Sequence, residues 1–287
     1  MNRSRSVALL LDGQATVEGA GVRLKRIFGY PEVPRFDPFL LLDDFGSDNP
    51  DDYIAGFPWH PHRGIETVTY MVSGEVEHSD SLGNEGVIGA GDMQWMTAGS
   101  GIVHQEMPRR VDDHLRGFQL WVNLPAAMKM TEPRYREVAA ASIPTVSPHP
   151  GMTIKVIAGE MVGVRGPVQD VAVKPVYLDI TLEPGADIEH PTPSSHTVFA
   201  YAVSGSGAVG PHSAHELRAG QLALFAPGGS VATAAGDRQF RFLLVSGQPL
   251  GEPVAWSGPI VMNTREELAT AFRDYQEGRF VADPINP

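Results

Sequence analysis

Four residues in two short segments of the chain have the types and spacing of metal ligands. His60 and His62 stand two positions apart, and His104 and Glu106 repeat this spacing. Successive side chains of a β-strand point to opposite faces, so each pair would point to one side. Two neighbouring strands of this kind would bring three imidazoles and one carboxylate together, which is a ligand set for a divalent transition metal. Because four protein ligands leave positions open on an iron-like ion, we expect a site for chemistry or sensing rather than a closed structural site.

The composition of the chain limits the kinds of site and partner. The chain has 287 residues, enough for one large domain or two smaller ones, and it contains no cysteine, so a metal must be held by nitrogen and oxygen donors. The net charge of −12 disfavours direct binding to nucleic acid or to an anionic membrane. No apolar segment approaches the length of a membrane span, and the run at 7–11 is too short for a signal peptide, so we expect a cytoplasmic location.

Short β-type segments lie between frequent prolines and glycines along the whole chain. They are rich in β-branched and aromatic residues, which is typical of a β-sandwich or barrel. The clearest of them are residues 67–72, 118–122, 153–157, 176–182 and 240–245. One helix is expected at about 265–277, because Thr264 and Glu267 form a capping box ahead of an apolar stripe. The stripe consists of Leu268, Ala271, Phe272 and Tyr275.

The chain also repeats itself at the level of short motifs. Residues 67–74 are echoed by 197–205, and residues 90–100 are echoed by 219–230. The interval between the two motifs is similar in both halves. This pattern predicts a tandem duplication of one β-domain, joined at a segment rich in proline.

The two copies predict an N-terminal domain over 1–143 and a C-terminal domain over 151–287. An offset of 130 residues places His190 opposite His60. The other three candidate ligands are replaced at this offset by Thr192, Ala234 and Gly236. We therefore expect one metal per chain, held by the N-terminal half.

These motifs resemble the cupin superfamily and, within it, the pirin family. The first cupin motif joins His-x-His to a glutamate, and this chain has His60-Pro-His62 followed by Glu66. In the second motif Thr97 replaces the usual proline and His104 lies two residues further on, as pirins have it. The strings that look like pirin signatures are residues 36–40, 60–64, 91–99, 101–107, 120–124 and 261–263.

The resemblance implies an all-β bicupin, with two tandem antiparallel β-barrels (double-stranded β-helices) and a short C-terminal helix packing back across the molecule. It also implies one metal in the N-terminal barrel, bound by His60, His62, His104 and Glu106. Most cupins use instead the glutamate at the position of Glu66, so the choice of carboxylate has two candidates. If one strand carried them both, the first histidine and Glu66 would be about 20 Å apart, which favours Glu106 and leaves Glu66 to orient a ligand histidine.

Two functions follow from the resemblance. The first is an Fe(II)-dependent dioxygenase that cleaves quercetin-like flavonols with O2, giving carbon monoxide and a depside. In this function the metal favours the deprotonated 3-hydroxyl of the flavonol, and Glu106 is the catalytic base. The second is a non-catalytic, iron-binding redox sensor that binds protein partners, as animal pirins act as transcriptional coregulators. The same ligands accept other divalent transition metals, so iron is an expectation from the family.

Aromatic and methionine residues near the motifs have two interpretations. Trp59, Trp95, Met96 and Met107 would line an apolar substrate cavity in one, and each would be part of the barrel core in the other. Strand parity alone does not decide between them.

Overall fold

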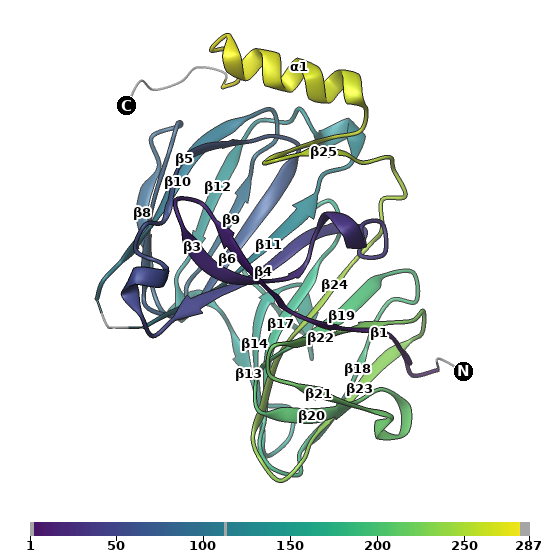
Figure 1. The fold of residues 1–287 in the computed structure, drawn as a ribbon. Coiled ribbons are helices and arrows are strands. Elements are labelled where there is room, and N and C mark those ends of the chain that lie inside the picture. Colours follow the sequence, from purple (N-terminus) through teal and green to yellow (C-terminus); the bar gives the residue numbers. More distant parts are fainter. Residues whose placement is uncertain (1–2, 112–113, 282–287) are drawn as a thin grey trace. The chain divides into compact units, whose positions relative to one another are not determined.

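The structure is a computed structural model that describes residues 3–111 and 114–281. The regular structure of this described part is mainly β-strand, with one α-helix, and it divides into two compact units (Figure 1). One unit, formed by Gln14–Ala140 and Leu250–Pro287, carries all the predicted ligands, and we call it the histidine unit. The other, formed by Met1–Gly13 and Ala141–Pro249, is the companion unit.

Two antiparallel sheets make up the histidine unit. The larger sheet has seven strands in the order β12-β9-β6-β11-β4-β3-β2, and the smaller has four in the order β5-β10-β7-β8. The strands of the larger sheet are β2 (Gln14–Glu18), β3 (Val22–Phe28), β4 (Phe39–Ser47), β6 (Ile65–Ser73), β9 (Met93–Thr97), β11 (Leu115–Asn123) and β12 (Arg134–Val138). The strands of the smaller sheet are β5 (Phe57–His62), β7 (Glu75–Asp80), β8 (Glu85–Ile88) and β10 (Ile102–Arg109). The pair β25 (Ala255–Ser257) and β26 (Ile260–Met262) also belongs to this unit.

Apolar side chains from both sheets pack between them. Leu24 and Phe45 of the larger sheet share one buried cluster with Val76 and Ile88 of the smaller sheet. Strand β10 alternates between buried and less buried residues, which is the pattern of a strand with one face on a core. This alternation puts the two predicted ligands of β10 on the buried face, as the sequence predicted.

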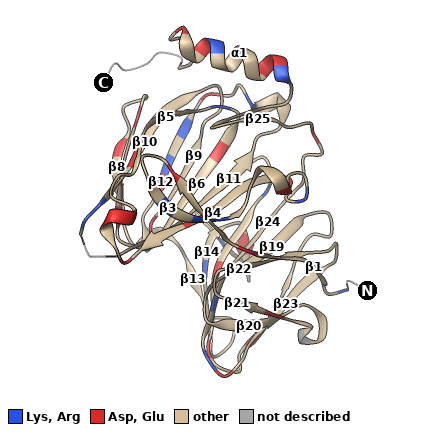
Figure 2. Cartoon of the chain, in the orientation of Figure 1, with Lys and Arg blue, Asp and Glu red and all other residues tan. Residues whose placement is uncertain are grey.

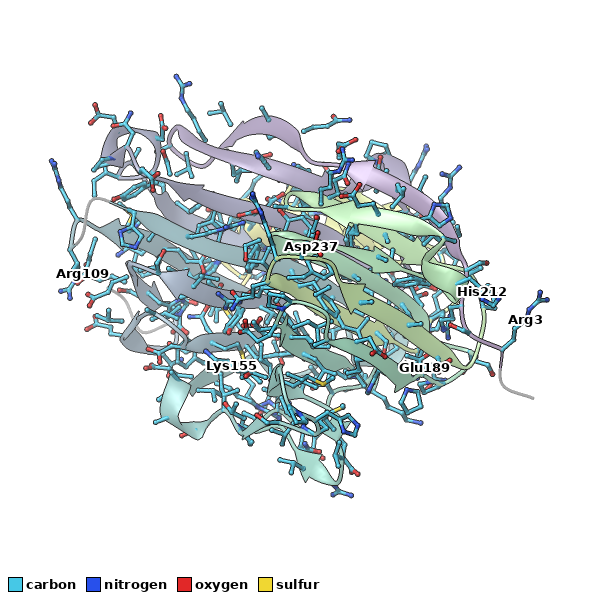
Figure 3. All side chains as sticks on the ribbon, turned by 90° about the horizontal axis from the view of Figure 1, so that it is seen from below. Arg3, Arg109, Lys155, Glu189, His212 and Asp237 are labelled. Atoms are coloured by element: carbon cyan, nitrogen blue, oxygen red, sulfur yellow. The ribbon has the colours of Figure 1, made fainter. Side chains whose placement is uncertain are left out.

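The end of β10 that is farthest from the predicted ligands is polar. The side chain of Arg109 extends outward from the ribbon there (Figure 3) and pairs with Glu77 at 2.6 Å. The candidate ligands therefore lie in the interior part of the strand, away from this charged end.

The companion unit repeats the arrangement of a seven-stranded and a four-stranded sheet. Their orders are β1-β22-β19-β24-β17-β14-β13 and β18-β23-β20-β21. The larger sheet contains β1 (Val7–Asp12), β13 (Thr145–Val146), β14 (Met152–Ala158), β17 (Val176–Leu182), β19 (Thr197–Ser204), β22 (Gln221–Phe225) and β24 (Phe240–Gly247). The smaller sheet contains β18 (Asp187–Pro191), β20 (Ser206–Val209), β21 (His215–Arg218) and β23 (Ser230–Ala235), and a separate pair is β15 (Glu160–Met161) and β16 (Val164–Arg165).

Short 3-10 helices connect strands in both units. They are η1 (Tyr30–Glu32), η2 (Pro50–Asp52), η3 (Ala126–Met128), η4 (Ala140–Ser142) and η5 (Pro211–Ser213).

The composition of the two units differs from the predicted domains 1–143 and 151–287 at both ends. Strand β1 pairs with β22, so the first strand of the chain belongs to the companion unit. The last segment, from Leu250 onward, belongs to the histidine unit. Strand pairing between residues far apart in the chain determines which segments belong to each unit. A prediction that divides the chain at a single linker does not include this pairing. The two-domain, all-β fold class is confirmed, although the sheets have free edges and are not closed barrels.

The predicted C-terminal helix is α1, Arg265–Gln276, and it lies beside β25 (Figure 1). Its N-cap is Thr264, and the capping box with Glu267 is present as predicted. Leu268, Ala271 and Phe272 pack against β26 and Phe280, but Tyr275 of the same stripe is 42% exposed. The stripe is thus only partly buried. Within the described residues, no helix is both long and apolar enough to cross a membrane.

Candidate metal centre

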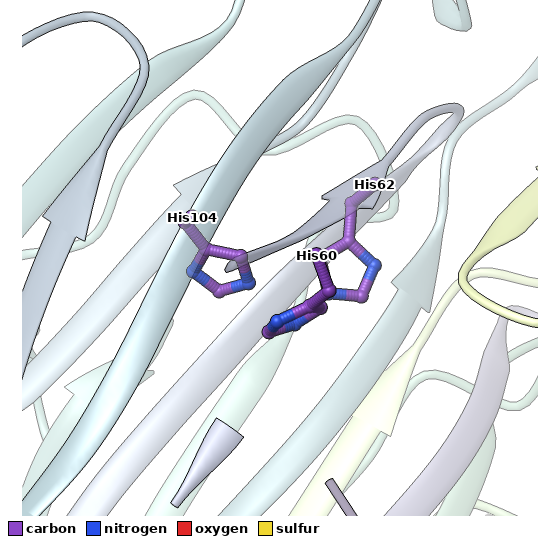
Figure 4. Close-up of side chains that lie close together, drawn as sticks. All are labelled: His60, His62 and His104. Carbon is purple, nitrogen blue, oxygen red and sulfur yellow. The ribbon is translucent and has the colours of Figure 1, made fainter. Parts of the chain in front are cut away.

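Three of the four predicted ligands converge in the histidine unit. His60 and His62 lie on β5, His104 lies on the neighbouring β10, and His60 and His104 are directly opposite in the strand pairing. Each imidazole has one nitrogen that lies within 4.8 Å of the corresponding nitrogens of the other two (Figure 4). Across residues 3–111 and 114–281, no other histidine and carboxylate cluster has this geometry.

Backbone carbonyl groups orient two of the imidazoles. His60 Nδ1 lies 2.8 Å from the Pro58 carbonyl oxygen, and His62 Nδ1 lies 3.1 Å from the Pro259 carbonyl oxygen. A carbonyl oxygen can only accept, so each Nδ1 donates and each Nε2 keeps its lone pair. The two Nε2 atoms are 3.1 Å apart. Two lone pairs at this separation repel one another unless a cation or a proton lies between them.

Burial favours the neutral form of His62 and His104. Burial, with a smaller contribution from His60, lowers the pKa of His62 well below its ordinary value. The pKa of His104 is lowered for the same reasons, with further contributions from His62 and His78. Neither ring nitrogen of His104 has a hydrogen-bond partner, although the side chain is fully buried. A neutral, unpartnered imidazole beside two aligned Nε2 atoms fits a bound divalent metal.

Glu106 lies outside the convergent group. The pairing of β10 with β5 shifts between His104 and Glu106, which puts Glu106 opposite Phe57. Its carboxylate crosses to the larger sheet, where it accepts hydrogen bonds from Thr69 Oγ1 at 2.9 Å and Gln119 Nε2 at 3.0 Å. The structure therefore brings three of the four predicted ligands together and holds the fourth nearby in hydrogen bonds to two polar side chains.

Glu66 is on a different strand from the histidines, contrary to the single strand considered in the sequence analysis. A turn at Gly64, which has a φ of +79°, ends β5 and leads into β6. Glu66 is buried and accepts a hydrogen bond from Thr97 Oγ1 at 2.7 Å. Burial raises the pKa of Glu66, and the bond from Thr97 partly offsets this effect. The Nδ1 atoms of His60 and His62 are held by backbone carbonyls, so Glu66 is not the group that orients these two rings.

A fourth histidine, which the sequence reasoning missed, lies beside the group. The ring of His78 on β7 is centred 5.3 Å from the ring of His104 and stacks on Tyr135 at 4.8 Å. Its Nε2 lies 3.4 Å from Asp80 Oδ2. The segment from His78 to Asp80 has the same two-residue spacing as the ligand pairs, and this spacing was the available signal. His78 is not one of the three convergent imidazoles.

A cavity of about 630 Å³ opens beside the histidines, and its lining includes His60, His62 and Glu106. This volume is in the range of small-molecule sites. The apolar part of its lining includes Val22, Leu24, Leu41, Phe45, Phe57, Val76, Leu115, Trp121 and Trp256. The residues singled out from sequence do not form this lining: Trp95 and Met96 are in the core, and Trp59 is 42% exposed.

A charged group also lines this cavity. Arg26 donates to both carboxylate oxygens of Asp43, at 2.9 and 2.8 Å, and to Glu18 at 2.8 Å. Burial raises the pKa of Asp43 to about 6, although the hydrogen bonds from Arg26 act in the opposite direction. The cavity thus combines an apolar wall with a polar group that could orient a ligand.

The equivalent position in the companion unit has different contacts. His190 on β18 pairs with Val231 on β23, so the residue opposite it is apolar. The residue that corresponds to His104 is therefore Val231, and Ala234, to which the offset of 130 residues pointed, lies three positions further on. Thr192, at the position of the second imidazole, accepts a hydrogen bond from Arg5 Nε at 2.8 Å. A guanidinium group at this point disfavours a second bound cation.

The two-sheet units and the histidine cluster on one of them define a protein of the cupin class. Sequence models match in both halves: the pirin model over residues 21–122 and the pirin C-terminal cupin domain over 177–281. The chain belongs to the pirin family. A pirin-like protein of Caulobacter vibrioides is 47% identical over 96% of this chain and 99% of its own length, and human pirin is 41% identical over 97% and 95%. A crystal structure of a quercetin 2,3-dioxygenase from Acinetobacter baumannii has a TM-score of 0.90 and 32% identity, covering 99% of this chain and all of the other.

Proposed function

We propose that this chain is a metal-dependent dioxygenase of quercetin-like flavonols, with iron held by His60, His62, His104 and Glu106. The observation that carries the proposal is the convergence of three imidazoles, two of which, His60 and His62, line a mostly apolar cavity. The likeness to the Acinetobacter quercetin 2,3-dioxygenase over the whole chain supports the substrate class.

The histidines are prepared for metal by their surroundings. The carbonyl oxygens of Pro58 and Pro259 fix the tautomers of His60 and His62, so their Nε2 atoms need no rearrangement to bind. When bound, Fe(II) supplies Lewis acidity for the 3-hydroxyl group of a flavonol and redox chemistry for O2.

Glu106 is proposed as both the fourth ligand and the base. Glu106 follows His104 by two residues. Its carboxylate lies at the cavity wall and accepts hydrogen bonds from Thr69 and Gln119. With a metal bound, a rotation of the side chain toward the imidazoles would let Glu106 serve as an oxygen ligand, and away from the metal its carboxylate would be the group that accepts the proton of the flavonol hydroxyl. The two hydrogen bonds give the carboxylate a defined position at the cavity wall when it is not a ligand.

The cavity supplies binding and orientation. Aromatic side chains such as Trp121 and Phe57 present apolar surface to the planar rings of a flavonol. The Arg26–Asp43 pair offers hydrogen bonds to the hydroxyl groups at the other end of such a molecule. The cytoplasmic location and the flavonol as natural substrate stay predictions.

The experiment is steady-state turnover of a flavonol panel by iron-loaded protein under oxygen. The proposal expects many turnovers per chain, carbon monoxide as a product, and loss of turnover when a chelator removes the metal. A stable iron site without turnover, combined with binding of a protein partner that depends on the redox state of the iron, would contradict the proposal and support the sensor function instead.

A further inference from the structure

We infer that the C-terminal segment, residues 259–280, acts as a clamp that positions the metal-binding end of β5. The ion pair between Arg63 and Asp274 is its central contact. The inference rests on the proposed metal site, because the clamp is inferred to affect how tightly that site binds its metal. We call this segment the C-terminal clamp.

Arg63 directly follows His62, and its side chain contacts Asp274 and Phe280 of the clamp. Arg63 Nη1 pairs with Asp274 Oδ2 of α1 at 2.8 Å, and Nη2 donates to the Phe280 carbonyl oxygen at 3.1 Å. The guanidinium carbon also lies 4.2 Å from the centre of the Phe280 ring. Arg63 is only 3% exposed, although the Asp274 side chain is 23% exposed, so these contacts are largely shielded from water and are stronger than at an open surface. Asp274 has a second, weaker neighbour in Arg279, at 3.7 Å.

The backbone of the clamp continues these contacts on both sides of Arg63. The Pro259 carbonyl accepts from His62 Nδ1, and Val261 N donates to the Arg63 carbonyl oxygen at 3.1 Å. Consecutive residues of the ligand strand are thus held by consecutive parts of one segment. The orientation of the His62 ring is set directly by a residue of the clamp.

A buried lysine joins the clamp to the turn behind β5. Lys129 Nζ donates to the Gly64 carbonyl at 2.9 Å, to Asn123 Oδ1 at 2.7 Å and to the Val261 carbonyl at 3.0 Å. The ammonium group uses all three of its donors in these bonds. It therefore fixes the distance between the turn that follows His62 and the strand β26.

Two glycines allow the clamp to approach both ligand strands closely. A Cβ atom at Gly64 would overlap the Val261 carbonyl oxygen, and one at Gly101 would overlap the Phe280 carbonyl oxygen. Gly64 follows the last residue of β5 by two positions, and Gly101 immediately precedes β10. The clamp therefore packs against the turns of both strands that carry the imidazoles.

These contacts make the position of α1 a determinant of metal retention. Charged residues gather at both ends of α1 (Figure 2), and among them Asp274 is the one paired with Arg63. Loss of this pair leaves a buried guanidinium with fewer partners and frees the start of the β5–β6 turn. The Nε2 atom of His62 then samples positions away from the other two imidazoles, which weakens metal binding without removing a ligand.

The test measures release of Co(II) from full-length protein to a chromogenic chelator, together with the visible spectrum of the Co(II)-loaded protein. Asp274→Asn keeps the size of the side chain and removes its charge, and we expect release to accelerate about 10-fold, as is typical when a group behind a ligand is altered. The Co(II) absorption bands should shift, because the ligand geometry relaxes. Asp274→Glu, which restores a carboxylate, should return release to within about threefold of the wild type.

The matched control is Asp44→Asn, which breaks the pair with Arg116 at 3.1 Å on the larger sheet of the same unit. It should lower the melting temperature without changing the Co(II) spectrum or release. The inference is overturned if Asp274→Asn leaves both the spectrum and the release rate unchanged, or if Asp44→Asn changes them equally. A wild-type protein that binds no Co(II) would overturn the proposed metal site itself, so the two failures are distinguishable.

Discussion

Gln119 and Glu106 join the two sheets of the histidine unit, because Gln119 Nε2 on β11 donates to Glu106 Oε2 on β10 at 3.0 Å. Together with Thr69, Gln119 holds the carboxylate outside the group of three imidazoles. In the proposed function, this same carboxylate would serve both as the fourth metal ligand and as the base.

Glu106→Gln tests the dual role of this carboxylate. Three imidazoles remain, so the variant should keep much of its metal, but its flavonol turnover should fall about 100-fold or more because the base is lost. Metal content by elemental analysis and kcat at saturating flavonol give the two readouts. A variant with near-normal kcat would contradict the assignment of Glu106 as base.

Glu66→Gln is the comparison for that variant. Glu66 is buried against Thr97 and is not part of the convergent group, so its amide should have a milder effect on both metal content and turnover. The general cupin pattern would apply, and our choice of carboxylate would be wrong, if Glu66→Gln lost its metal while Glu106→Gln retained it.

The free energy of unfolding should depend on pH through Asp43. Its pKa is about 6 in the folded protein, above its ordinary value of 3.8, so between these values the folded state binds more protons than the unfolded state. The contribution of Asp43 to stability is therefore full below about pH 4 and is lost as the pH rises through 6, by an amount of about 2–3 kcal/mol. Denaturant unfolding of the wild type and of Asp43→Asn at pH 4 and pH 7 should show a steeper decline with pH for the wild type. Equal slopes would contradict this role.

His190→Ala tests the assignment of chemistry to one unit. His190 lies on β18 opposite an apolar residue, and burial lowers its pKa to about 4. We expect metal content and turnover to change by no more than about threefold. Loss of metal in this variant would show that the companion unit takes part in the site.

The alternation of side chains along a strand was enough to predict that the three imidazoles come together, because the two-residue spacing on β5 and on β10 is a local property of extended backbone. The position of Glu106 could not be read in the same way, since it depends on a shift in the pairing of β10 with β5 that leaves no mark in composition. The place of Glu66 depends on the turn at Gly64, and a glycine after Arg63 was a signal that could have been used.

Contacts between distant parts of the chain were also beyond local patterns. Repeats and turn residues predicted the duplication, but the pairing of β1 with β22 joins residues more than 200 positions apart. The helical spacing that predicted a buried stripe on α1 did not show how deeply each member is buried, and Tyr275, which contacts the ring of Phe280, is 42% exposed.

The most direct test of the proposed function measures metal content and oxygen-dependent flavonol turnover in one iron-loaded preparation of the wild type and of His104→Ala. His104 is fully buried, and neither of its ring nitrogens has a hydrogen-bond partner. We predict close to one metal per chain and sustained turnover in the wild type, with both lost in His104→Ala. Turnover that persists in the metal-free variant, or full metal content without His104, would contradict the metal-dependent dioxygenase proposed for this chain.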